Sequence, residues 1–547
     1  MNKFTPTIKD SAKIKLKRTA KKIVQTVHMN PKDKGKKLYY NYLSLPIKEN
    51  FIFYEAFSGL GILDNPRALF NFLLDNPDTH HYTHVWSIEN IESASDNLKE
   101  YSEYKNVIIV ERESADYYKY LATCQYLISN STFGYYFEKR KEQVYINTWH
   151  GVPTKYMGYE HTIECVENAR GPARNFLMAD YILSANRFMT DIMYKRAYML
   201  DGLFQGKILE LGYPRIDTVL TAGKTVTYKR LEALGMDTNK KIILYAPTWK
   251  GTLYNNLDYS VEELKETIHK MSAGIDQNQY KIYIRVHYFL YKILKDDPDF
   301  KDILIPFTID TNELLSVVDI LISDYSSIFF DFLVTGRPIL FYVPDLKDYK
   351  KNRGLYVPIK KLPGYVTADV EMIATSLTAI CQNPEQYLEF YSERYIEMQD
   401  WCLEKEDGHS CERIVDTIFK KQDMPIAFNT LKNYKTQTLI CVNTNANSHN
   451  VLEELKEYLD NVNYFSTDIT VLATAFKDES YKEFFNHLPK QIRILVWYEL
   501  PFVTKRTENF YQREVRRTLG ESEFDEVKFI GKVTEYWAGF ANAVVGE

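Results

Sequence analysis

Short apolar runs alternate with amphipathic stretches along most of the chain from residue 51 onward. The first series of such runs predicts strands at residues 51–54, 84–87, 107–110, 126–129 and 144–148. Helical patterns separate most of them, among them one over residues 66–74. This alternation is typical of a parallel sheet with helices on both of its faces.

A second series of the same kind begins at Lys241. It predicts strands at residues 242–245, 281–286, 303–306, 320–323 and 338–342, with helices at 261–271 and 312–318. Residues 384–421 are mostly helical in pattern. We therefore expect an α/β protein whose two Rossmann-like lobes (41–220 and 221–425) face a cleft at the carboxyl ends of their strands.

A third and shorter series predicts strands at residues 439–442, 469–473 and 494–497, with helices at 449–458 and 481–487. Three strands are too few for a doubly wound domain. We expect residues 430–547 to be a partial α/β domain of glycosyltransferase-like type, cut short by truncation or within a natural fusion. Its last residues should be poorly ordered or incompletely packed.

Composition narrows the class of protein. The chain has 547 residues, of which 45% are hydrophobic, and this excludes a mainly disordered or collagen-like protein. Its six cysteines form no CxxC pair, so a disulfide scaffold or a zinc site is not expected and a reducing cytosol fits. No apolar run reaches the ~18 residues of a membrane span. The aromatic residues are spread out, which argues against a nucleic-acid-binding surface.

Charge is distributed very unevenly. Residues 1–40 hold eleven lysines and one arginine against two aspartates, a net +10, so the remaining 507 residues carry −15. Apolar residues recur every three or four positions between Ile8 and Val27, with lysines between them. If helical, this basic amphipathic segment would lie on an anionic membrane surface. The alternative is a solvated basic tail or an RNA-binding arm.

Three groups of polar residues follow predicted strands. Asp324, Ser326 and Ser327 stand between a strand and a helix, where unpaired N–H groups and two hydroxyls suit a phosphate, although simple helix capping would explain part of the pattern. His150 ends a strand before a Gly-Val-Pro turn and suits a general base, and Lys155 suits a phosphate contact. The alternative for His150 is a structural role in the turn.

The third group is Arg285 and His287, which alternation along a strand would place on the same face. A guanidinium and an imidazole side by side would stabilise a pyrophosphate, whereas the simpler alternative is a strand end with two solvated side chains. The chain contains no complete GxGxxG motif, no Walker GKT or GKS, and no DxD, so the sequence identifies no metal ligands.

Seven blocks in order resemble one known family: FIFYEAFSGLGILDNPR, NTWHGVPTKYMG, GYPRID, LYAPTWK, RVHY, SDYSSIFFDFLVTGRPILFYV and DGHSCERIV. Together they look like the CDP-glycerol glycerophosphotransferases, the teichoic acid primases and polymerases, over about residues 50–420. The resemblance implies transfer of glycerol phosphate or ribitol phosphate from a CDP-alditol to a hydroxyl of a lipid-linked teichoic-acid-type or capsular acceptor, with release of CMP.

The resemblance also implies a GT-B fold, in which two Rossmann-like lobes face a cleft, and it implies residue roles. His150 matches the family's catalytic base, and His287 matches a second essential histidine at the donor phosphates. Asp324, Ser326 and Ser327 match the motif that holds the donor pyrophosphate, and Arg285, Arg337, Thr248 and Lys155 are further expected substrate-binding residues. The sequence itself does not require a cofactor, and it is compatible with Mg²⁺.

The basic N-terminal segment fits this resemblance, since a lipid-linked acceptor lies on the inner membrane face. We therefore expect a peripheral position on the cytoplasmic face of the cell membrane, reached through residues 1–40. Two other functions stay open at this point. One is a GT-B glycosyltransferase that uses a nucleotide sugar, and the other is a non-catalytic binding module at the membrane surface.

Overall fold

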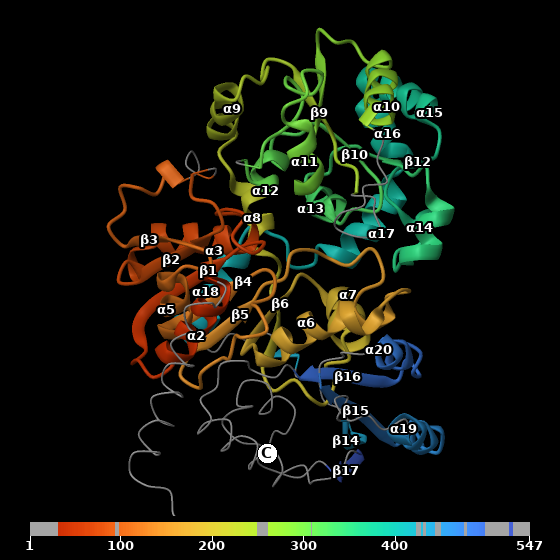
Figure 1. Cartoon of the computed structure of the whole chain (residues 1–547). Coiled ribbons are helices and arrows are strands. Elements are labelled where there is room, and N and C mark those ends of the chain that lie inside the picture. The colour runs from red at the N-terminus through yellow and green to blue at the C-terminus, as the bar shows by residue number, and fades with distance from the viewer. Residues whose placement is uncertain are drawn as a thin grey trace, which may run out of the picture.

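The structure is a computed structural model in which three β-sheets are layered with helices (Figure 1). It describes residues 31–92, 94, 98–248, 261–307, 309–422, 428–429, 434–442, 450–474, 479–497 and 524–528. Nearly all neighbouring strands in the three sheets run parallel. The expected α/β class with parallel sheets is therefore confirmed.

The first sheet has the strand order β13-β7-β6-β5-β4-β1-β2-β3. Its strands are β1 (Lys48–Glu55), β2 (Thr83–Ile88), β3 (Val107–Glu111), β4 (Cys124–Ser129), β5 (Val144–Asn147), β6 (Tyr181–Ser184), β7 (Lys207–Glu210) and β13 (Phe428–Asn429). Only β13 runs antiparallel to its neighbour. All five strands predicted for this region are present. The predictions missed β6 and β7, since runs of four residues give an ambiguous periodic signal, although β5 of the same length was predicted.

The second sheet has the order β12-β11-β10-β8-β9 and is wholly parallel. Its strands are β8 (Lys241–Tyr245), β9 (Tyr280–Ile284), β10 (Ile320–Ser323), β11 (Ile339–Tyr342) and β12 (Tyr365–Thr367). The strand expected at 303–306 is reduced to a single bridge between Ile284 and Leu304. The strand expected at 281–286 ends at Ile284, which matters for Arg285 and His287 below.

Helices cover both sheets. The first sheet and the helices before β8 are called the first part below; these helices are α2 (Pro31–Tyr42), α3 (Asp64–Asp75), α5 (Ala115–Thr123), α6 (Cys165–Met178), α7 (Arg187–Met189), α8 (Pro214–Thr221) and α9 (Lys224–Ala233). The second sheet and the helices that follow β8, up to α18, are called the second part; these helices are α10 (Val261–Ala273), α11 (Tyr288–Leu294), α12 (Thr311–Leu315), α13 (Ile328–Leu333), α14 (Leu346–Arg353), α15 (Val370–Gln382), α16 (Pro384–Phe390), α17 (Ser392–Cys402) and α18 (Ser410–Ile418). In the described part of the chain, no helix is long and apolar enough to span a bilayer.

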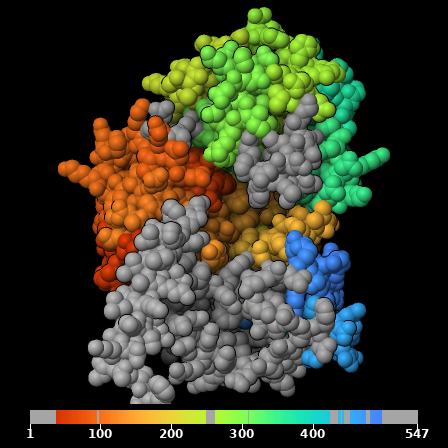
Figure 2. Space-filling view, in the orientation of Figure 1, coloured from red at the N-terminus to blue at the C-terminus, as the bar shows by residue number. Residues whose placement is uncertain are grey.

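The two large sheets are joined through one continuous apolar core. That core contains Leu69 and Ile146 from the first part together with Leu321 and Phe329 from the second. Helix α18 returns from the second part to pack on α3 and α8. Figure 2 shows the second part (green) seated on the first (orange). We call this boundary between the two parts the junction, and side chains there contact residues of both parts.

Both sheets have a switch point, where the chain changes from one direction along the sheet to the other. In the first sheet it lies between β1 and β4, and in the second between β8 and β10. Ligands of open α/β sheets bind beyond the carboxyl ends of the strands at such points. The segments that follow β4, β8 and β10 are therefore the natural places to look for a site.

The third sheet has the order β16-β15-β14-β17, with β17 antiparallel. Its elements are β14 (Thr436–Val442), α19 (Asn450–Asp460), β15 (Thr467–Thr474), α20 (Glu479–Asn486), β16 (Ile492–Trp497) and β17 (Phe524–Lys528). It packs on the first part, where buried Arg493 donates hydrogen bonds to the carbonyls of Met199 and Asp201. The expectation of poor order after β17 falls outside the described residues.

The N-terminal basic pattern also falls largely outside the described residues, since residues 1–30 are not among them. Helix α2 follows directly and packs on α5. Tyr39 of α2 is fully buried, and its hydroxyl donates to the carbonyl of Glu138 over 2.9 Å. The segment boundary expected at residue 40 therefore lies inside a helix that belongs to the folded body.

Candidate functional site

Two segments from different sheets meet at the junction. The loop after β5 contains His150, Gly151 and Lys155, and the loop after β10 contains residues 324–327. The hydroxyl of Thr154 donates to the carbonyl of Tyr325 over 2.5 Å. A β-carbon at position 151 would lie 2.7 Å from the Ser327 hydroxyl oxygen. The structure thus brings the expected base and the expected phosphate-binding serines to one place.

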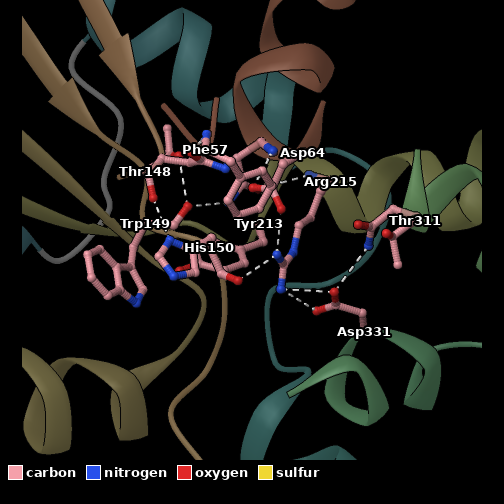
Figure 3. A network of polar contacts seen from close by, with 12 residues as sticks. Phe57, Asp64, Thr148, Trp149, His150, Tyr213, Arg215, Thr311 and Asp331 are labelled. Carbon is pink, nitrogen blue, oxygen red and sulfur yellow. Dashed lines mark hydrogen bonds and ion pairs between the residues drawn. The ribbon is translucent and has the colours of Figure 1, made fainter. Parts of the chain in front are cut away.

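His150 is half-buried beside Trp149 and Phe57, with ring centroids 4.3 and 5.5 Å away (Figure 3). Its Nδ1 lies 2.6 Å from the carbonyl oxygen of Asn130, the residue that follows β4. A carbonyl only accepts hydrogen bonds, so Nδ1 carries the hydrogen. In the neutral ring Nε2 then has the lone pair and is the nitrogen that can accept a proton.

The surroundings favour the neutral form of this ring. Burial lowers the pKa of His150, the hydrogen bond to Asn130 and the charge of Asp64 oppose the shift, and the positive charges of Arg215 and Lys155 add to it. The pKa therefore lies below its ordinary value of 6.5. At neutral pH His150 is unprotonated, as a general base must be.

A buried arginine that our sequence predictions did not include lies at the centre of the junction. Arg215, in the first turn of α8, donates to the His150 carbonyl over 2.8 Å and pairs with Asp64 over 2.7 Å (Figure 3). Its other terminal nitrogen lies 2.9 Å from Asp331 of α13. Its position in the GYPRID block, after a strand end, was the only sequence signal.

Asp324 is buried and organises its own loop. Its carboxylate accepts hydrogen bonds from the backbone N–H of Thr248 over 2.7 Å, from the Thr248 hydroxyl and from the N–H of Ser326 over 3.1 Å. Burial raises its pKa, and these donors oppose the shift. This contact joins the residues beyond β8 and β10, across the switch point of the second sheet. Thr248 and Asp324 thus shape the loop that presents the serines.

Positive groups gather beside this loop. Burial, followed by the positive charge of Arg353, lowers the pKa of Lys155 to about 8, and the negative charge of Asp324 opposes the shift. The exposed ring of His287 has a pKa lowered by partial desolvation and by Lys155. Arg353 was not among the predicted residues. Lys155, Arg353 and His287 come from three separate elements and make this region suited to an anion.

The expectation that Arg285 and His287 share a face is wrong. Strand β9 ends at Ile284, so strand alternation does not extend to these residues. Arg285 is buried and donates to the carbonyls of Pro306 and Ile309, with its guanidinium 4.5 Å from the centroid of Phe307. His287 instead begins helix α11 and is exposed. Arg285 therefore supports the residues that lead into α12.

Arg337 lies at the amino ends of the strands of the second sheet, opposite the carboxyl ends where Asp324 lies. It precedes β11 and donates to the carbonyls of Ser316 and Val318, which precede β10. Asp324 follows β10, so roughly 15 Å of strand separates the two positions at 3.3 Å per residue. The structure does not bring Arg337 together with the other predicted residues. The sequence motif placed them close along the chain, but helix α13 between them carries the chain back to the opposite end of the strands.

No group of three or more His, Cys, Asp or Glu side chains able to hold a metal ion occurs among the described residues. Polar side chains at the junction instead pair with one another. Compatibility with Mg²⁺ stays a prediction.

Comparison with known proteins gives the family. The model of the CDP-Glycerol:Poly(glycerophosphate) glycerophosphotransferase family matches residues 38–420. The chain is 32% identical over 400 residues to the teichoic acid poly(glycerol phosphate) polymerase of Bacillus spizizenii, covering 68% of this chain and 93% of that protein. It is 28% identical to the teichoic acid glycerol-phosphate transferase of Staphylococcus aureus, covering 70% and 96%.

The fold is similar as well. A solved structure of the wall teichoic acid polymerase TagF is 26% identical and superposes with a TM-score of 0.60, covering 75% of this chain and 98% of that one. The matched region of the family model contains the second sheet, the first sheet except β13, and the whole junction between them, and it leaves out the third sheet. The chain therefore belongs to the CDP-Glycerol:Poly(glycerophosphate) glycerophosphotransferase family and is a transferase of teichoic acid biosynthesis.

Proposed function

We propose that this enzyme transfers glycerol phosphate from CDP-glycerol to a hydroxyl of a lipid-linked teichoic-acid-type acceptor. The acceptor oxygen forms a new bond to the β-phosphorus of the donor, and the bond from that phosphorus to the oxygen of CMP breaks. The hydroxyl proton passes to His150, and CMP leaves with the bonding electron pair. A solved TagF structure obtained with CDPG, 26% identical to this chain, supports this donor.

The observation that carries the proposal is the orientation of His150. Its Nδ1–H is held by the Asn130 carbonyl, so the basic Nε2 is available at the switch point of the first sheet. The Ser327 hydroxyl stands against the adjacent Gly151. A base and a phosphate-binding group are thus neighbours at one junction, as in-line phosphoryl transfer requires.

In this proposal the donor pyrophosphate lies over the loop after β10. Ser326 and Ser327 contribute hydroxyls, and Lys155 and His287 contribute positive charge or N–H donors. Asp324 and Thr248 hold that loop in shape and do not themselves contact the phosphates, since a carboxylate repels an anion and the Thr248 hydroxyl already donates to Asp324. We further propose that the two large sheets form the two lobes of a GT-B arrangement, with the acceptor on the side of the first sheet.

A lipid-linked acceptor would require the enzyme to work at the cytoplasmic face of the membrane. We propose that the basic residues before α2 provide this contact, because their positive charges and apolar spacing suit an anionic surface. Since α2 belongs to the folded body, the variant to test removes residues 1–30 only. It should pellet less with anionic liposomes than the full chain, and equal pelleting would refute the membrane contact.

The donor test follows CMP release with CDP-glycerol and CDP-ribitol in turn, each with a lipid-linked acceptor. CMP release that depends on both CDP-glycerol and acceptor is the expected result. CDP-ribitol is included because the teichoic acid ribitol-phosphate primase of B. spizizenii is 29% identical to this chain over 318 residues. A preference for CDP-ribitol would change the proposed alditol but not the proposed reaction. No CMP from either donor would overturn the proposal.

A further inference from the structure

Arg215 makes hydrogen bonds or ion pairs to both sides of the junction while it is itself only 5% exposed. One terminal nitrogen donates to the carbonyl oxygen of His150 over 2.8 Å. The other lies 2.9 Å from the carboxylate of Asp331, which belongs to the helix that starts directly after Ser327. A single rigid guanidinium therefore joins the loop of the base to the helix that follows the phosphate-binding serines (Figure 3).

A second residue holds the preceding peptide of the same loop. The side-chain amide of Asn65 donates to the carbonyl of Trp149 over 3.1 Å, and its oxygen accepts the backbone N–H of Arg215 over 3.1 Å. Trp149 has a φ of +49°, in the left-handed region that bulky residues rarely adopt. Bonds to the carbonyls of residues 149 and 150 keep this backbone in a conformation that it would not favour by itself.

The negative partners of Arg215 are themselves fixed. Asp64 pairs with it over 2.7 Å, and the backbone N–H of Asp64 donates to Asp310 over 2.8 Å. Asp331 also accepts a hydrogen bond from Asn312 over 3.2 Å. Both carboxylates are buried, so neither can turn to solvent without losing its charged partner. The guanidinium is thus held in one orientation.

We propose that Arg215 is a positioning residue that sets the distance between the base His150 and the donor phosphates held at Ser326 and Ser327. This inference rests on the proposed function. Arg215 acts through the His150 carbonyl and through Asp331, and it does not touch substrate. Lysine cannot replace it, because one ammonium cannot hold both the His150 carbonyl and Asp331 in the planar geometry of a guanidinium.

The test uses Arg215→Lys and Asp331→Asn. In each variant the folded enzyme should bind CDP-glycerol within about threefold of wild type by calorimetry. Its kcat for CMP release should fall on the order of 100-fold, since a shift of about 1 Å in a reacting group costs this much. Asp331→Asn preserves the shape of the side chain and so provides a result if Arg215→Lys does not fold.

Arg493→Ala is the matched control. Arg493 is also a buried arginine that joins two parts of the structure, since it donates to the carbonyls of Met199 and Asp201 and lies 3.0 Å from the carboxylate of Asp468. None of these partners belongs to the loop of His150 or to the network around Arg215. The variant should lower the melting temperature while the folded enzyme keeps its kcat. If Arg215→Lys and Asp331→Asn behave like Arg493→Ala, Arg215 is only a structural residue. An inactive wild type would instead refute the proposed function.

Discussion

Gly151 and Ser327 are in direct contact across the junction of the two large sheets. A β-carbon on Gly151 would lie 2.7 Å from the Ser327 hydroxyl oxygen and 3.4 Å from a terminal nitrogen of Arg215. The φ of Gly151 is +154°, a conformation that residues with a side chain rarely adopt. The residue after the base is therefore constrained both by its backbone and by a neighbour from the other sheet.

Gly151→Ala should lower kcat on the order of 10- to 100-fold, because the added methyl group must push His150 and Ser327 apart. CMP release under saturating substrate measures this. Gly171→Ala is the control, since a β-carbon there meets nothing within 4 Å in helix α6. It should keep full activity, with no gain in stability, because Pro172 follows directly and disfavours the helical conformation for a preceding residue with a side chain. Full activity in Gly151→Ala would mean that this contact is not needed.

The rate should depend on pH through His150. Its pKa lies below 6.5, so the neutral base persists at neutral pH and, on the acid side, kcat/KM should fall as pH drops through a midpoint below 6.5. His150→Ala should lose turnover at every pH while it keeps CDP-glycerol binding by calorimetry. His487→Gln, an exposed histidine on the third part, should retain the wild-type profile. A midpoint above 7 would argue against His150 as the base.

Donor affinity should weaken on the alkaline side because of Lys155. Its pKa of about 8 means that the ammonium is charged below this pH and neutral above it. The Kd for CDP-glycerol should therefore rise as pH increases through about 8. Lys155→Arg should abolish this rise in Kd, since arginine stays charged, and the Lys155→Met variant should bind CDP-glycerol weakly at all pH values. A rise in Kd near pH 8 that persists in Lys155→Arg would mean that a group other than Lys155 titrates there.

Arg285→Met should destabilise the fold without weakening donor binding. Loss of the guanidinium leaves the buried carbonyls of Pro306 and Ile309 without their charged donor, at a cost of about 3 kcal/mol in the free energy of unfolding. Urea denaturation measures this loss, and calorimetry measures the Kd. Lys281→Met, on the same strand β9, should change both values little. Weaker donor binding with unchanged stability would return Arg285 to the substrate site.

Part of the site could be predicted from the sequence, because the residues of each loop are neighbours along the chain. His150 and Gly151 follow one strand, and Ser326 and Ser327 follow another, so strand ends and helix starts marked both loops. The roles of Arg285 and Arg337 depended on details that periodicity does not resolve. One strand ended two residues early, and a whole strand length separated Arg337 from the serines.

The sequence by itself determined the α/β class, nearly all of the longer strands, and the family through seven ordered blocks. These features depend on hydrophobic periodicity and on short motifs, which are properties of neighbouring residues. The tertiary structure alone decided that Arg215, Asp64 and Asp331 share one buried network at the side of His150. These residues are more than 60 positions apart in the chain, and only the packing of the two sheets makes a buried charge pair of them.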